Sequence, residues 1–316
     1  MKDTDTPGGR LFSRRDMLAL AAGIGAAAAL PFNSSLAASG TVLTRPIPRT
    51  GERLPVVGLG TAIVFDIGED AARRAERRAV IQALIDGGAR LIDTAPSYGT
   101  AESVLGDLLA AMGARERVFL ATKVRATGRD ESIAEMQQSL RRLRTDKVDL
   151  IQLHNVNDGA TDLRPLKEWR DQGRARYIGI THFVAGAYAR LAEVMRREKP
   201  DFVQLNYSLA ERSAEERLLP LAADTGTAVL VNLPFGRGKL FAAVRGRALP
   251  EWAKEFDATT WAQFFLKFLI SHPAVTCVMP GTDKPEYMLD NLAAGRGRLP
   301  DAALRRRMVE FWSSVG

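Results

Sequence analysis

The stretch RLIDTAPSYG, residues 90–99, is a short apolar run that ends on a charged residue and then turns. Its apolar start favours a buried strand, Asp93 ends that strand, and the Pro-containing turn behind it carries Tyr98. Apolar runs with polar ends recur along the chain. This recurrence predicts a buried parallel sheet with polar groups gathered at its carboxyl edge.

Working outward from this stretch, eight apolar runs alternate with segments of helical period. The runs are VVGLG (56–60), RLID (90–93), VFLATK (118–123), VDLIQLH (148–154), YIGIT (177–181), FVQLN (202–206), AVLVN (228–232) and TCVMP (276–280). Helical patterns cover 70–86, 101–112, 132–143, 163–172, 187–197, 214–224, 259–270 and 285–292, and a further helix is expected over 300–312. Eight strand–helix units predict a closed (β/α)8 TIM barrel. The alternative, an open doubly wound sheet that binds a dinucleotide, would be indicated by a GxGxxG turn after an early strand, and GLGTA (58–62) does not match this motif.

Function in a barrel of this kind sits at the carboxyl ends of the strands. The polar residues at or near those ends are Asp93, Lys123, His154, Thr181, Gln204, Asn206 and Asn232. A phenol with a pKa of ~10 is a poor acid at neutral pH until a nearby cation stabilises its phenolate. Lys123 supplies such a cation, Asp93 holds it, and His154 orients a carbonyl oxygen. Together with Tyr98 they indicate reduction of an aldehyde or ketone.

Two loops favour a phosphorylated ligand. PFGRGKL (234–240) exposes the backbone amides of Gly236 and Gly238 beside Lys239. PGTDKPEYMLDNL (280–292) leads into a helix N-terminus next to Lys284. Loops after the last two strands commonly bind phosphate in barrels, and the helix dipole attracts anions. A simple turn is the alternative for each Gly-rich stretch taken alone.

These segments together resemble the aldo-keto reductase family over nearly all of residues 43–292. The similar motifs are GLGT, IDTAPSYGTAESVLG, ATKV, DLIQLHN, FVQLNYS and VMPGTDKPEYMLDNL, in the family's order. The resemblance implies that Tyr98 is the general acid and that Asp93, Lys123 and His154 complete a catalytic tetrad. It also implies an NADP cofactor, with NAD as the alternative, and no metal.

The resemblance and the two phosphate-binding loops together predict a set of residues that bind the cofactor. They are Thr181, His182, Gln204, Gly236, Gly238, Lys239, Gly281, Thr282, Lys284, Asp290 and Asn291. By resemblance, Gln204 is expected at the nicotinamide carboxamide and Asp290 and Asn291 near the adenine. The family pattern is not fully kept, because Thr181-His182 stands where Ser-Asn is common and Asn232 replaces a frequent aromatic residue. Near the adenosine 2′-phosphate, Gly281 and Tyr287 stand where some relatives carry Lys and Arg, and Lys284 is the expected substitute.

The first 38 residues are interpreted as a twin-arginine-type export signal. Arg14 and Arg15 precede an Ala- and Gly-rich apolar run over 17–30, and small residues follow near Ala37. That run is shorter than the roughly 20 residues of a membrane span, so no stable span is expected after processing. The alternatives are an Ala-rich helix of the mature fold or a disordered extension. Residues 39–316 are expected to form one barrel domain with a C-terminal helix.

The export signal predicts a periplasmic or exported protein that uses the twin-arginine machinery, or a cytoplasmic one if the signal is not used. The chain of 316 residues carries a net charge of +7, but its basic residues are spread over helix faces, which argues against a nucleic-acid partner. The predicted function is NAD(P)H-linked reduction of a small carbonyl compound. The alternative is an exported nicotinamide-binding regulatory or sensing module without significant turnover.

Overall fold

The computed structural model of the chain describes residues 40–125, 128–156 and 162–315. The predicted export signal lies outside these residues. In the described part, no helix combines the length and the apolar character needed to cross a membrane.

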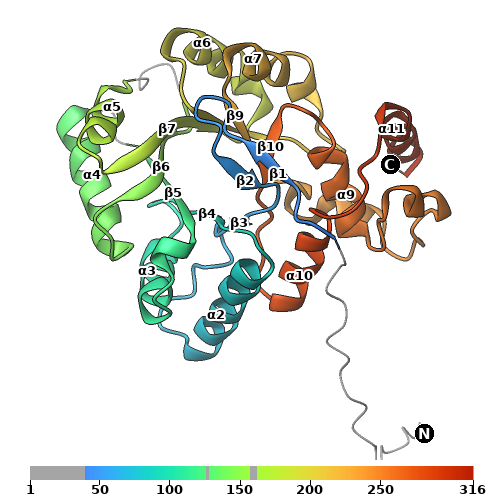
Figure 1. Cartoon of the computed structure of the whole chain (residues 1–316), viewed down its shortest axis with the longest axis horizontal. Helices are drawn as coiled ribbons and strands as arrows, with labels where there is room; N and C mark the ends of the chain where they lie inside the picture. The colour runs from blue at the N-terminus through green and yellow to red at the C-terminus, as the bar shows by residue number, and fades with distance from the viewer. Residues whose placement is uncertain (1–39, 126–127, 157–161, 316) are drawn as a thin grey trace, which may run out of the picture. The chain divides into compact units, whose positions relative to one another are not determined.

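Eight parallel strands form the sheet, and each pairs with the next one along the chain. They are β3 (Leu59–Gly60), β4 (Leu91–Asp93), β5 (Phe119–Val124), β6 (Val148–His154), β7 (Ala175–His182), β8 (Phe202–Asn206), β9 (Ala228–Asn232) and β10 (Val275–Val278). Bridges from Val57 to Val278 and from Gly60 to Gly281 join the first strand to the last. The predicted (β/α)8 TIM barrel is therefore confirmed, and Figure 1 shows its ring of helices around the strands.

The helices that follow the strands occupy the segments with helical period. They are α2 (Ala71–Asp86), α3 (Ala101–Ala111), α4 (Arg129–Arg142), α5 (Arg164–Asp171), α6 (Tyr188–Glu198), α7 (Leu218–Thr225), α8 (Lys239–Ala243), α9 (Trp261–Ile270), α10 (Pro285–Ala293) and α11 (Ala302–Val315). The start predicted at residue 214 was wrong, because α7 begins at Leu218. Pro220 lacks the N–H that a helix interior needs and is tolerated only in the first turn, which fixes this start.

A short antiparallel hairpin precedes the barrel and was not predicted from the sequence. Its strands are β1 (Thr44–Pro46) and β2 (Arg53–Pro55). Ile47 and Leu54 of this hairpin are fully buried among side chains from the amino-terminal halves of the barrel strands, such as Phe119. The hairpin thus plugs the amino end of the barrel and leaves the carboxyl end as the open one.

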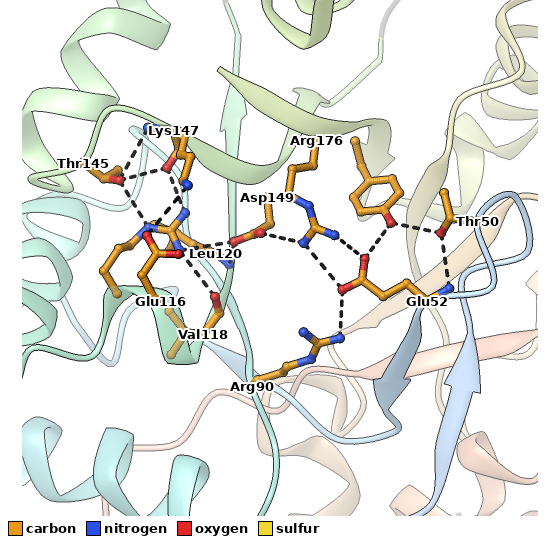
Figure 2. A network of polar contacts seen from close by, with 12 residues as sticks. Thr50, Glu52, Arg90, Glu116, Val118, Leu120, Thr145, Lys147, Asp149 and Arg176 are labelled. Atoms are coloured by element: carbon orange, nitrogen blue, oxygen red, sulfur yellow. Dashed lines mark hydrogen bonds and ion pairs between the residues drawn. The ribbon is translucent and has the colours of Figure 1, made fainter. Parts of the chain in front are cut away.

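The hairpin is also tied to the barrel by a polar network, drawn in Figure 2. The carboxylate of Glu52 accepts hydrogen bonds from Arg90 Nη2 at 2.9 Å, from Tyr177 Oη at 2.6 Å and from Arg176. Arg176 also donates to Asp149 at 2.9 Å, which links the hairpin to β6. Burial alone would raise the pKa of Glu52, but the hydrogen bonds from Tyr177 and Arg176 hold it below its usual value.

Replacing Glu52 by glutamine is expected to destabilise the barrel by about 1–3 kcal/mol, because charge-assisted hydrogen bonds at a partly buried position are lost. Urea denaturation at pH 7 measures the change. Glu116→Gln is the matched control, since Glu116 is exposed and its contact with Lys147 is 3.9 Å long. An equal loss of stability in both variants would contradict a special role for Glu52.

Candidate active site

A buried ion pair lies at the carboxyl end of the barrel interior. Lys123 on β5 donates to Asp93 Oδ2 on β4 at 2.5 Å and to the Thr94 carbonyl at 2.8 Å. The Lys123 side chain is fully buried. Burial by itself lowers the pKa of the ammonium group, but Asp93 and Tyr98 outweigh burial and raise this pKa. Lys123 is therefore a fixed positive charge at this end of the barrel.

Two glutamines share the other oxygen of the same carboxylate. Asp93 Oδ1 accepts from Gln152 Nε2 at 3.0 Å and from Gln204 Nε2 at 2.9 Å. Since a carboxylate only accepts, both amide nitrogens must face Asp93, and the amide oxygens point away from it. Gly179 pairs with Gln152 in the neighbouring strand, and a Cβ there would lie 3.0 Å from Gln152 Cγ. The glycine thus makes room for a glutamine inside the barrel.

Tyr98 and His154 lie over this ion pair. The Lys123 ammonium is 4.8 Å from the centroid of the Tyr98 ring. The rings of Tyr98 and His154 meet edge to face, with centroids 6.0 Å apart. The four residues predicted as a tetrad are thus brought together by the loop after β4 and by the ends of β4, β5 and β6.

The imidazole of His154 is held in its neutral form. Burial, reinforced by the positive charges of Lys123 and Arg125, lowers the pKa of His154 to about 3. A neutral imidazole carries one N–H donor and can hydrogen-bond a carbonyl oxygen without contributing a charge. Ser97 Oγ lies 3.5 Å from its Nδ1.

This lowered pKa has a consequence for stability. The unfolded chain binds a proton at this imidazole below pH 6.5, whereas the folded state keeps the ring neutral down to about pH 3. The free energy of unfolding should therefore fall with decreasing pH, with His154 contributing about 2 kcal/mol by pH 5. Urea denaturation at pH 7 and pH 5 measures this slope. His154→Gln should flatten it by that amount, and an unchanged slope would contradict the assignment.

The pair Thr181-His182 ends β7 beside Gln204. Thr181 Oγ1 donates to Gln204 Oε1 at 3.3 Å, and Asn232 Nδ2 lies 3.5 Å from the same oxygen. The backbone N–H of Val184 donates to His182 Nδ1 at 3.0 Å. Burial lowers the pKa of His182, so its ring is neutral at pH 7 and its proton is on Nε2. His182 therefore offers a single N–H donor at this strand end.

A pocket of about 460 Å³ lies between the loops after β9 and β10. Its lining is Phe235, Phe241, Thr260, Trp261, Ala262, Gly281, Tyr287, Asp290 and Asn291. Three of the residues predicted for cofactor binding are in this lining, together with Tyr287, which the sequence comparison had placed near the 2′-phosphate. Phe235 and Phe241 were not singled out from the sequence. Asn291 Nδ2 donates to Thr282 Oγ1 at 3.1 Å, and the Asp290 carboxylate accepts from Gln263 at 2.7 Å.

The two loops predicted to bind phosphate have different structures. Gly236–Gly238 form one 3-10 turn in which all three residues have positive φ, and Lys239 starts α8. The Arg237 guanidinium lies 5.7 Å from the Phe183 ring centroid, which joins this loop to the one after β7. Lys284 is the N-cap of α10, and its ammonium lies 5.6 Å from the Tyr287 ring centroid.

Several buried polar atoms at this end of the barrel have no hydrogen-bond partner within the described residues. They are Thr94 Oγ1, Gln152 Oε1, Asn155 Oδ1, Asn206 Oδ1 and Asn232 Oδ1. Buried polar groups in native proteins are normally paired, so these acceptors fit a site that binds a polar ligand. Gln152 was missed from the sequence, although it stands two residues before His154 and a strand points alternate residues the same way.

Comparisons with known proteins agree with this geometry. A family model described as the aldo/keto reductase family matches residues 56–307. Methylglyoxal reductase YeaE of Escherichia coli (strain K12) is 32% identical over 232 residues, which cover 71% of this chain and 80% of the relative. An aldo-keto reductase of Klebsiella pneumoniae solved with NADPH is 25% identical, with a TM-score of 0.74 over 86% of this chain and 95% of the other. A structure from the same organism with NADP and acetate is 26% identical, with a TM-score of 0.70 over 83% and 93%.

Proposed function

Because this chain belongs to the aldo/keto reductase family, we propose that it reduces an aldehyde or ketone with a nicotinamide cofactor and with Tyr98 as the general acid. The observation that carries the proposal is the buried pair of Lys123 and Asp93 directly below Tyr98. A fixed ammonium group stabilises the phenolate that remains after the proton has left. Without this charge, a phenol would be a poor acid at neutral pH.

The neutral His154 has the complementary role. Its N–H holds the carbonyl oxygen near the Tyr98 hydroxyl, so the proton moves to an oxygen that is already oriented. The buried setting favours this arrangement, because electrostatic interactions are stronger where water is excluded. The cofactor supplies the hydride when bound, and the protein supplies position, a proton and a fixed charge.

The end of the barrel fits a nicotinamide carboxamide. Such a group has one carbonyl acceptor and one NH2 donor group. His182 offers a donor at Nε2. Gln204 Oε1 is turned away from Asp93, which binds the amide nitrogen, and its contacts with Thr181 at 3.3 Å and Asn232 at 3.5 Å are long, so it offers the acceptor. Donor and acceptor come from neighbouring strands, so this arrangement favours one orientation of the carboxamide. Asp93 then has a second task besides holding Lys123, which is to fix the amide of Gln204.

We favour NADP over NAD. Two solved relatives bind NADP or NADPH, and Lys284 is a cation at the helix start beside the aromatic pocket. A helix N-terminus with a nearby lysine suits a phosphate group. The Asp290 carboxylate, which accepts hydrogen bonds from Thr260 and Gln263, lines the same pocket and would face the adenosine part.

The test uses the full-length chain. NADPH and NADH binding are titrated by fluorescence, and NADPH oxidation at 340 nm is followed with a panel of carbonyl compounds that includes methylglyoxal. Saturable binding of NADPH together with carbonyl-dependent oxidation is the expected result. Tight binding without turnover over the whole panel would contradict an enzymatic role and favour a binding module instead.

A further inference from the structure

Arg77, on α2, is a buried cation whose main partners are backbone carbonyls. Its side chain is 7% exposed, and its neighbour Glu76, at 3.1 Å, is 54% exposed. Arg77 Nε donates to the Val64 carbonyl at 2.6 Å, and Nη1 donates to the Asp283 carbonyl at 2.5 Å. A buried charge is costly unless it is well hydrogen-bonded, so these two carbonyls are what makes the position tolerable.

The two carbonyls lie on opposite sides of the seam that closes the barrel. Val64 belongs to the loop after β3, and Asp283 belongs to the loop after β10. Among the described residues, two isolated bridges join the first strand to the last, and β3 itself has two residues. Arg77 reaches across this weakly paired seam at the carboxyl end, where helices α2 and α10 also pack side by side (Figure 1).

The loop after β10 carries groups that the proposed function uses, and the loop after β3 carries an exposed apolar side chain. Thr282 and Lys284 flank Asp283, and Lys284 is the cation expected at the cofactor phosphate. Ile63 precedes Val64, has a φ of 69°, and leaves its side chain 79% exposed. A β-branched residue in the left-handed region is strained and persists only where its surroundings hold it. Arg77 is the side chain that bonds both of these loops at once.

We propose that Arg77 is a positioning residue that fixes the loop of Thr282–Lys284 against the loop of Ile63–Val64. It thereby places Lys284 for the 2′-phosphate and sets the preference for NADP over NAD from outside the pocket. This inference rests on the proposed function, since it assumes that the pocket binds the adenosine end of a dinucleotide. The residues proposed to hold the nicotinamide end lie on β7 and β8, and the hydrogen bonds of Arg77 go to other loops, so binding at that end should be little affected.

The experiment compares Arg77→Met with Arg78→Met in the full-length chain. Arg78 is the next residue on α2 and is exposed, so its variant removes a charge without removing the two carbonyl contacts. The dissociation constant of NADP⁺ is expected to rise roughly ten-fold in Arg77→Met, the change that follows if Lys284 loses one charge-assisted hydrogen bond to the 2′-phosphate. The dissociation constant of NAD⁺ should rise less than about two-fold. Arg78→Met should match the wild type for both dinucleotides.

Hydrogen exchange gives a second readout that needs no cofactor. In Arg77→Met, amide exchange should become faster in residues 62–66 and 282–286 and stay unchanged in β6 and β7. Arg77→Lys keeps the charge but cannot donate to both carbonyls in the forked geometry of a guanidinium group. It should change the NADP⁺ dissociation constant and the exchange rates in the same direction by smaller amounts. This variant replaces Arg77→Met in the experiment if Arg77→Met does not fold.

Two results would overturn the inference. One is an equal weakening of NADP⁺ and NAD⁺ binding, which indicates a general structural role. The other is unchanged binding and unchanged exchange in a folded Arg77 variant. A wild-type chain that binds neither dinucleotide overturns the proposed function instead, and the exchange comparison then still decides whether Arg77 holds the two loops.

Discussion

Replacing Tyr98 by phenylalanine is expected to lower kcat for carbonyl reduction by about 10²–10⁴-fold, the usual contribution of a positioned general acid. The ring should stay in place, because its edge-to-face contact with His154 does not depend on the hydroxyl group. NADPH affinity should therefore change by less than about two-fold. Steady-state kinetics and a fluorescence titration on the same preparation measure both quantities.

The matched control is Tyr177→Phe. The hydroxyl of Tyr177 donates to Glu52 at the closed end of the barrel, so its loss should cost stability without changing kcat. A Tyr98→Phe variant that keeps most of its turnover would remove the general-acid assignment. Equal losses of kcat in the two variants would point to a folding defect instead of a chemical role.

Replacing Lys123 by methionine is expected to damage both folding and turnover. Asp93 would remain buried without its cation, and breaking a buried ion pair in this way typically costs about 3–5 kcal/mol. The free energy of unfolding, measured by urea denaturation, should fall by this amount. Carbonyl reduction should fall by at least about 10²-fold, because the phenolate loses its stabilising charge.

A double variant separates these two effects. In Lys123→Met with Asp93→Asn, no uncompensated charge is left in the barrel, and most of the lost stability should return. Turnover should stay low, because the ammonium group is still missing. Recovery of turnover together with stability would show that Lys123 acts only as a structural partner of Asp93.

The strand–helix alternation could be predicted from the sequence because strands buried on both faces are apolar at nearly every position. A strand such as VDLIQLH (148–154) must be apolar almost throughout, and its polar end marks the barrel mouth. The hairpin of β1 and β2 has no such pattern. Its strands have three residues each, which is too short for a clear pattern. The burial of Ile47 and Leu54 depends on side chains of barrel strands that lie further along the sequence.

The candidate site divides in the same way. Asp93, Tyr98, Lys123 and His154 were identified because each follows or ends an apolar run, and the structure brings them together. Their roles remain predictions until they are measured. Gln152 was not predicted as a site residue. A single polar residue inside an apolar strand pattern has no evident role until its partner across the barrel, here Asp93, is known.

The sequence by itself determined the eight-unit barrel and the set of polar residues at its mouth, because period and burial are local properties of the chain. Only the tertiary structure decided how those residues act on one another. The Asp93 carboxylate binds side chains from three other strands, and Arg77 bonds Val64 and Asp283, so these contacts join segments far apart in the chain. The neutral state of His154 likewise depends on burial and on cations from other segments. Such contacts depend on distances across the folded barrel, and pKa values and hydrogen-bond directions follow from those distances and from burial.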